Sequence, residues 1–258
     1  MQRLDSLDFL CKILRADNSI ANASIDLSHH RTIFILIYYI QNTWVMPRES
    51  RNRVNASPEE FLHDLKPGEH GCVFFFTKEE MQHIHFAFVK SGLDNNWGVV
   101  YLTATESIDE VRKSMQKHGI NTRQHEESGD GSLIILKGEE IYKNPNNPDI
   151  DNWINATKSI SDMFTSKGKK GVRVAADLSA YFISHGLVEQ WHKLEYVLGK
   201  KLSLPMSILC AYDSGSSKTW DTDLLKFYDQ IDSETKEFVD AHSFVIYTSK
   251  QKSVILTI

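Results

Sequence analysis

The chain has 258 residues, a formal net charge of −5, an apolar fraction of 41% and a charged fraction of 24%. These values are ordinary for a soluble globular protein that can bury a sizeable core. The acidic balance argues against a broad nucleic-acid surface, which needs clustered lysine and arginine, so we expect no direct nucleic-acid binding.

Residues 1–56 differ in pattern from the rest of the chain. The apolar run at 32–40 is shorter than the roughly 20 residues of a membrane-spanning helix, and it lacks the cleavage site of a secretory signal. Two interpretations of this extension stay open. In the first, Met46 is the true start and the preceding residues are an upstream extension. In the second, these residues form an N-terminal helix and strand packed on the domain or on a second subunit.

From Ser57 onward, helical and strand signals alternate. Ser57, Pro58 and Glu60 supply an N-cap, a first-turn proline and a capping-box glutamate, which predict a short helix over 58–65. Continuous apolar runs predict buried strands at 72–76, 98–103, 132–136, 172–176 and 207–210. Helical spacing and caps predict helices that start near residues 78, 108, 150 and 187, with two more at 224–228 and 235–242. Two late strands are expected at 244–248 and 254–258, and they could pair as a hairpin.

Buried strands that alternate with helices are typical of βαβ units with a mainly parallel sheet. No internal repeat or low-complexity linker divides residues 57–258. We therefore expect this span to form one α/β domain.

The stretch KPGEHGCVFFFTKEE at 66–80 joins a turn, a strand and a helix where a nucleotide-binding protein would carry its glycine-rich phosphate loop. No such loop is present in the sequence. Thr77 and Glu80 instead predict a capping box, which occupies the first helical amides and sets carboxylates where a phosphate would sit. The pattern indicates a nucleotide-binding architecture without the nucleotide chemistry.

Five stretches, taken in order, resemble the MEDS family of sensory domains, named after methanogens, methylotrophs and the dichloromethane-responsive regulator. These stretches are GEHGCVFFF at 68–76, WGVVYLTATES at 97–107, SLIIL at 132–136, VRVAADLSAY at 172–181 and MSILCAYD at 206–213. The resemblance covers about residues 66–248. The family is itself similar to RecA and KaiC ATPases with eroded ATPase motifs.

The resemblance implies a three-layer α/β/α, RecA- or KaiC-like fold with a degenerate phosphate loop. It also implies a sensory role in archaeal or bacterial signalling, often in transcription regulation through fused DNA-binding or kinase modules. The sequence carries no convincing helix-turn-helix and no kinase motif. We therefore expect a cytoplasmic input module, without a membrane span, that acts through a signalling or transcription-regulatory protein partner. The sequence leaves a homo-oligomer open.

Ligands of open parallel sheets bind beyond the carboxyl ends of the strands. Asp177 matches the magnesium-associated aspartate of RecA-like ATPases, but without a phosphate loop we expect a structural cap or a ligand contact there. Glu69 and His70 could form a charge-assisted pair, or they could fix the turn before the first strand. The predicted ligand-binding residues are Glu69, His70, Phe76, Thr77, Thr105, Glu106, Asp177, Ser179, Tyr212 and Asp213.

We predict no metal site from the sequence. His83 and His85 would point about 200° apart on a helix and cannot chelate one ion. The cysteines, Cys11, Cys72 and Cys210, lack metal-ligand spacing, so we expect reduced and buried thiols. The sequence also has no Gly-x-Ser-x-Gly elbow, so hydrolysis is a remote interpretation.

The leading hypothesis is a non-enzymatic sensor, without a cofactor, that binds a small molecule or a protein signal at the strand-end rim. The alternative is a KaiC-like ATP-binding protein or weak ATPase, with ATP and magnesium at an atypical site around Thr77, Lys78 and Asp177. A third hypothesis is a purely structural interaction domain.

Overall fold

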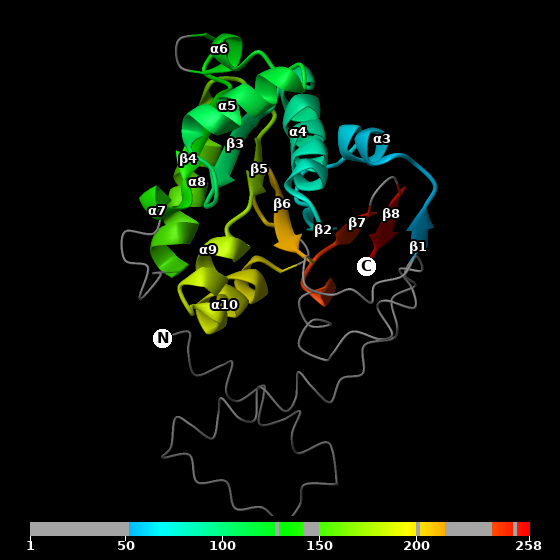
Figure 1. Cartoon of the computed structure of the whole chain (residues 1–258). Coiled ribbons are helices and arrows are strands. Elements are labelled where there is room, and N and C mark those ends of the chain that lie inside the picture. Colours follow the sequence, from blue (N-terminus) through cyan, green and yellow to red (C-terminus); the bar gives the residue numbers. More distant parts are fainter. Residues whose placement is uncertain (1–51, 127–128, 142–149, 200–201, 215–238, 250–251) are drawn as a thin grey trace, which may run out of the picture. The chain divides into compact units, whose positions relative to one another are not determined.

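The computed structural model describes residues 52–126, 129–141, 150–199, 202–214, 239–249 and 252–258 (Figure 1). Met46, the apolar run at 32–40, the predicted helix at 224–228 and most of that at 235–242 lie outside these residues. No helix in the described part of the chain is long and apolar enough to cross a membrane.

An eight-stranded sheet forms the centre of the domain, in the order β1-β8-β7-β2-β6-β5-β3-β4. The six strands from β7 to β4 in this order run parallel, whereas β8 is antiparallel to β7 and β1 is antiparallel to β8. The strands are β1 (Asn52–Val54), β2 (His70–Phe75), β3 (Gly98–Thr103), β4 (Leu133–Lys137), β5 (Val172–Ala176), β6 (Met206–Asp213), β7 (Phe244–Ser249) and β8 (Lys252–Thr257). The predicted α/β class, the mainly parallel sheet and the late hairpin are confirmed.

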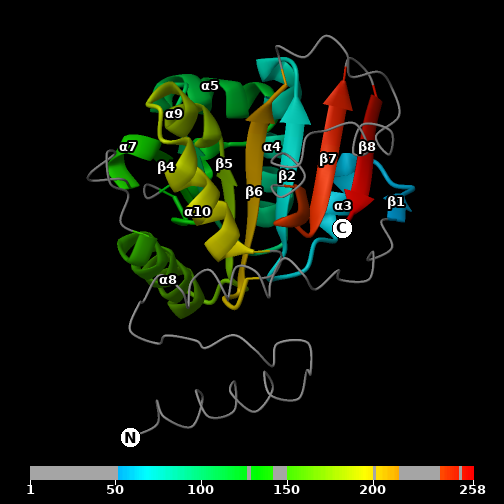
Figure 2. The same cartoon turned by 90° about the horizontal axis from the view of Figure 1, so that it is seen from below.

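Helices cover both faces of this sheet, so the domain has three layers (Figures 1 and 2). One apolar core joins the sheet to α3, α4 and α5, and a second core on the opposite face joins it to α8, α9 and α10. The helices are α3 (Pro58–His63), α4 (Lys78–Asp94), α5 (Ile108–Lys117), α6 (Thr122–His125), α7 (Gly138–Ile141), α8 (Ile150–Ser166), α9 (Ser179–Ser184) and α10 (Val188–Leu198).

Strand β2 shows why the apolar runs could be recognised. Cys72 and Phe74 pack in the core under α9 and α10, while Val73 packs in the core under α3 and α4. Because successive side chains of a strand point to opposite faces, a strand covered on both faces must be apolar at every position.

Helix starts follow the predicted capping boxes. Ser57, Thr77 and Ser107 each accept a hydrogen bond from the amide three residues later, and the glutamate at that position returns a bond to the cap residue. These local bonds set the first turns of α3, α4 and α5.

The sheet also contains an element that the sequence analysis did not predict. β1 pairs with β8 over Asn52–Val54, so the folded unit begins a few residues before the expected Ser57. A strand of three residues is too short to show a period, and its partner lies at the other end of the chain. The short helices α6, α7 and α9 were not predicted, because they are too short to show a repeating apolar pattern and, unlike for α3, no capping box was predicted for them.

Candidate functional site

The first turn of α4 is closed by its own side chains. The Glu80 carboxylate accepts hydrogen bonds from the backbone amides of Phe76 at 2.9 Å and Thr77 at 3.0 Å. The Thr77 hydroxyl oxygen in turn accepts a hydrogen bond from the Glu80 backbone amide at 3.2 Å. Backbone amides that could cradle a phosphate at a helix start are therefore already bonded to a carboxylate.

Lys78, the adjacent cation, is held by a buried acid. Its Nζ lies 2.8 Å from Oε1 of Glu106, whose residue is 3% exposed. The Gln82 amide donates to both oxygens of the same carboxylate, at 3.1 and 3.0 Å. The hydrogen bond that Lys78 donates to Glu106 is the main reason that the pKa of Lys78 is raised. Lys78 is thus committed to a neighbour within the domain.

Asp177 closes the loop that follows β3. Its carboxylate accepts hydrogen bonds from the hydroxyl of Thr105 at 2.7 Å, the hydroxyl of Thr103 at 3.3 Å and the backbone amide of Ala104. Burial raises the pKa of Asp177, and these hydrogen bonds oppose that shift. The carboxylate is surrounded by donors from one loop, which is the geometry of a structural cap.

The structure brings Phe76, Thr77, Thr105, Glu106 and Asp177 to the carboxyl end of the sheet, as expected for residues that follow parallel strands. There Phe76 packs edge-on against Tyr247, with ring centroids 5.9 Å apart.

Of the other predicted site residues, Asp213 also lies at the carboxyl end of the sheet, whereas the rest face inward or lie at the opposite end. Ser179 is buried and donates its hydroxyl to the carbonyl of Ala211 at 2.5 Å. Asp213 is exposed at the end of β6, but Tyr212 points into the core because β6 continues past the predicted end at residue 210. Glu69 and His70 stand at the amino end of β2, away from the rim.

A buried polar cluster lies under α10, on the face of the sheet that α9 and α10 cover. We call it the His70 cluster, and its members are His70, Glu195, Cys210 and His242. His70 opens β2, Cys210 lies in β6, Glu195 lies in α10 and His242 precedes β7. One nitrogen, oxygen or sulfur atom from each residue lies within 4.8 Å of all the others.

Glu195 is the centre of the hydrogen bonds in this cluster. Its Oε1 accepts the Trp191 indole N–H and the Tyr212 hydroxyl, each at 2.9 Å. Its Oε2 faces the Nε2 atoms of His70, at 3.3 Å, and His242, at 3.5 Å. Burial raises the pKa of Glu195, but the contacts with His70, His242 and Trp191 outweigh burial and lower the pKa to about 2. Glu195 is therefore ionised inside the core.

His70 is oriented by a backbone carbonyl. Its Nδ1 lies 2.8 Å from the carbonyl oxygen of Gly199, and because a carbonyl can only accept, this nitrogen carries the proton. Its Nε2 faces both Glu195 and the Cys210 sulfur, which is 3.7 Å away. Burial, followed by the charge of Glu195, raises the pKa values of the Cys72 and Cys210 thiols.

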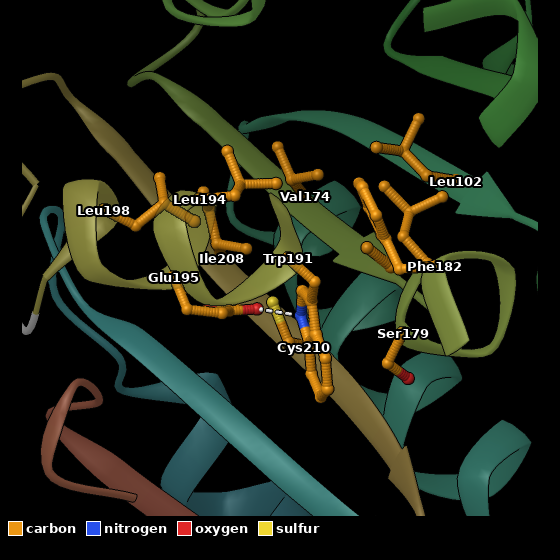
Figure 3. A pocket seen from close by; sticks show the side chains of 12 residues that line it. Leu102, Val174, Ser179, Phe182, Trp191, Leu194, Glu195, Leu198, Ile208 and Cys210 are labelled. Atoms are coloured by element: carbon orange, nitrogen blue, oxygen red, sulfur yellow. Dashed lines mark hydrogen bonds between the residues drawn. The ribbon is translucent and has the colours of Figure 1, made fainter. Parts of the chain in front are cut away.

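A cavity of about 30 Å³ adjoins this cluster between α9, α10 and the sheet. That volume is sufficient to hold a water molecule. Figure 3 shows the Cys210 sulfur and the hydrogen bond from Trp191 to Glu195 beside a wall of aliphatic side chains. The cavity is lined by Leu102, Val174, Ala176, Leu178, Ser179, Phe182, Trp191, Leu194, Glu195, Leu198, Ile208 and Cys210.

The sequence analysis did not identify the His70 cluster as a group, because its members come from four elements far apart in the chain. One local signal did exist. Trp191, Leu194 and Leu198 mark the buried stripe of α10, and Glu195 falls on the same stripe at helical spacing. An acid at a core position of an amphipathic helix indicates a buried partner.

Comparison with known proteins gives one family and one structural similarity. The model of the methanogen/methylotroph, DcmR sensory (MEDS) domain matches residues 69–226, more than half of the chain. No curated protein matches the sequence. A KaiC-like protein from the hyperthermophilic archaeon Pyrococcus horikoshii OT3 is similar in structure, with a TM-score of 0.46 and 14% sequence identity, over 72% of this chain and 74% of that one.

Proposed function

This chain belongs to the MEDS family of sensory domains, and we propose that it is a non-enzymatic sensor that detects a small molecule and passes the signal to a protein partner through α10. Its signal site is the cavity beside the His70 cluster. Sensing in this form uses no nucleotide and no catalytic residue.

The observation that carries the proposal is that α10 lines the cavity with one face and exposes apolar side chains on the other. Its inner face supplies Trp191 and Glu195 to the cavity wall and to the buried cluster. Its outer face carries Tyr196, 69% exposed, and Val197, 48% exposed, which are the large exposed apolar residues of the described chain. A small molecule larger than the present cavity has to displace α10, and that displacement moves the exposed residues with it.

The start of α4 supports the nucleotide-free part of the proposal. Glu80 occupies the amides of Phe76 and Thr77, and Glu106 holds Lys78. A triphosphate at this position would have to displace a carboxylate from two amides and a buried carboxylate from a lysine. Both exchanges bring like charges together, which is unfavourable.

A ligand screen by thermal shift tests the sensor. A compound that binds the folded state raises the melting temperature in a concentration-dependent way, and Trp191 should change its fluorescence as the compound enters beside it. The variant Val174→Ile, which adds a methylene to the cavity wall, should abolish the shift. The matched variant Val254→Ile, on β8 and outside the residues that line the cavity, should retain it. A screen without any stabilising compound would instead support the structural interaction domain.

A further inference from the structure

We propose that the His70 cluster is a metal site, in which His70, Glu195, Cys210 and His242 bind one divalent transition-metal ion, with Zn²⁺ as the favoured ion. This inference goes beyond the sensory function, since it assigns the buried cluster an ion of its own, distinct from the signal molecule.

The distances between the donor atoms fit a tetrahedral ion. With Zn–N and Zn–O bonds of about 2.0–2.2 Å and a Zn–S bond of about 2.3 Å, neighbouring ligand atoms of a tetrahedron lie roughly 3.3–3.6 Å apart. In the structure, Oε2 of Glu195 lies 3.3 Å from Nε2 of His70 and 3.5 Å from Nε2 of His242. The sulfur of Cys210 lies 3.7 Å from the same His70 nitrogen. A small contraction around an ion would complete the site.

Hydrogen bonds around His70 and Glu195 hold the atoms of these two residues that do not face the centre. Nδ1 of His70 donates to the carbonyl of Gly199, so Nε2 is the nitrogen that would bind the ion, in place of any proton it shares with Glu195. Metal-binding histidines commonly use this arrangement. Oε1 of Glu195 is held by Trp191 and Tyr212.

The inner oxygen of Glu195 provides a second, independent observation. Among the described residues, Oε2 of this carboxylate is buried and no donor reaches it in hydrogen-bond geometry; its polar neighbours are Nε2 of His70 at 3.3 Å and Nε2 of His242 at 3.5 Å. Leaving such an oxygen without a donor is unfavourable, whereas a cation in the centre of the cluster would satisfy it.

Charge and ligand type favour zinc over harder ions. Two neutral histidines, one thiolate and one carboxylate carry two negative charges, which a divalent ion balances. The Cys210 proton leaves to solvent when the ion binds, as is usual for thiol ligands. Nitrogen and sulfur donors suit Zn²⁺, whereas Mg²⁺ and Ca²⁺ prefer sites made of oxygen atoms.

Cys72 offers a matched control for Cys210. The two cysteines are register partners on neighbouring strands, β2 and β6, and both are free thiols. Cys210 Sγ belongs to the group of converging donor atoms, whereas Cys72 does not. Substituting the two in turn therefore separates ligation from a general loss of buried sulfur.

The test uses the full chain, stripped with a chelator and titrated with CoCl₂ and ZnCl₂. We expect one Co²⁺ per chain, with visible bands of tetrahedral cobalt and a thiolate-to-cobalt charge-transfer band, and displacement of cobalt by zinc. Cys210→Ser should abolish the charge-transfer band, while Cys72→Ala and the surface variant His118→Ala should retain it. Far-UV circular dichroism of each variant establishes that it is folded.

Glu195→Gln is the second variant, because it keeps the shape of the side chain if Cys210→Ser does not fold. It should weaken zinc binding at least tenfold, since losing even a residue that only orients a ligand typically costs about 10–100-fold in metal affinity. Absence of stoichiometric binding in the wild-type chain, or cobalt binding with no thiolate band, would overturn the proposal. Neither result bears on the small-molecule screen with Val174→Ile, so a failed metal site and a failed sensor remain distinguishable.

Discussion

The Nζ atom of Lys78 lies 2.8 Å from the buried carboxylate of Glu106, which ties the start of α4 to the loop after β3. The lysine is about half exposed, so solvent screens the ion pair itself. The hydrogen bonds from the Gln82 side-chain amide to both oxygens of Glu106 are buried, so Gln82 depends on Glu106 for its acceptor.

Glu106→Ala should therefore destabilise the domain by about 1–3 kcal/mol, because it leaves the buried amide of Gln82 without its acceptor. Urea denaturation measures the change. Glu79→Ala is the matched control, since Glu79 is an exposed acid in the first turn of α4, and it should change stability by less than about 0.5 kcal/mol. Equal effects of the two substitutions would show that burial of Glu106 contributes nothing.

Arg173 is a second buried charge with a structural role. It is 1% exposed and donates to the carbonyl of Leu62 at 2.9 Å and to the hydroxyl of Ser91, and its guanidinium lies 5.0 Å from the Phe88 ring centroid. These contacts join β5 to α3 and α4. Burial lowers its pKa to about 10, so Arg173 stays charged at neutral pH.

Arg173→Met should cost about 2–4 kcal/mol, because it leaves buried acceptors unpaired and removes the packing over Phe88. Chemical denaturation with circular dichroism gives the value. Arg112→Met, which removes an arginine bonded to Glu126 near the surface, should cost less than about 1 kcal/mol. A smaller loss of unfolding free energy in Arg173→Met than in Arg112→Met would contradict the structural role of Arg173.

Because His85 is buried in its neutral form, we expect the domain to lose stability in mild acid. Its side chain is fully buried against Tyr101, and neither ring nitrogen has a hydrogen-bond partner among the described residues. Burial lowers its pKa to about 3 from an ordinary value of 6.5. Below pH 6.5 the unfolded chain binds a proton that the folded chain does not, so stability falls as the pH drops from 6.5 toward 3.

At pH 5 this difference amounts to about 2 kcal/mol relative to pH 7. His85→Phe removes the titrating group and should flatten the dependence by that amount, even if packing shifts the absolute stability. Denaturation midpoints at pH 5 and pH 7 for both proteins supply the comparison. An unchanged difference between the two pH values in the variant would rule out His85 as its source.

The parts of this fold that could be predicted are those encoded locally. The capping boxes at Ser57, Thr77 and Ser107 each need residues only three positions apart, and β3 and β5 were predicted with their observed ends. The carboxyl-end residues Thr105 and Asp177 meet because parallel strands end at the same edge.

The parts that could not be predicted depend on long-range pairing. The extra length of β6 decides that Tyr212 faces the core, and that length depends on pairing with β2. Closely spaced candidate ligands such as His83 and His85 can be recognised in a sequence. His70, Glu195 and His242 instead converge through the order of the strands and the placement of α10.

Isothermal titration of the full chain with ATP and Mg²⁺ tests the central claim most directly, namely that the start of α4 has no room for a triphosphate. We predict no measurable heat of binding for the wild-type chain, and none for Lys78→Ala or for the control Lys90→Ala. Micromolar affinity that disappears in Lys78→Ala and Asp177→Ala, but persists in Lys90→Ala, would contradict the nucleotide-free sensor and establish an ATP-binding protein.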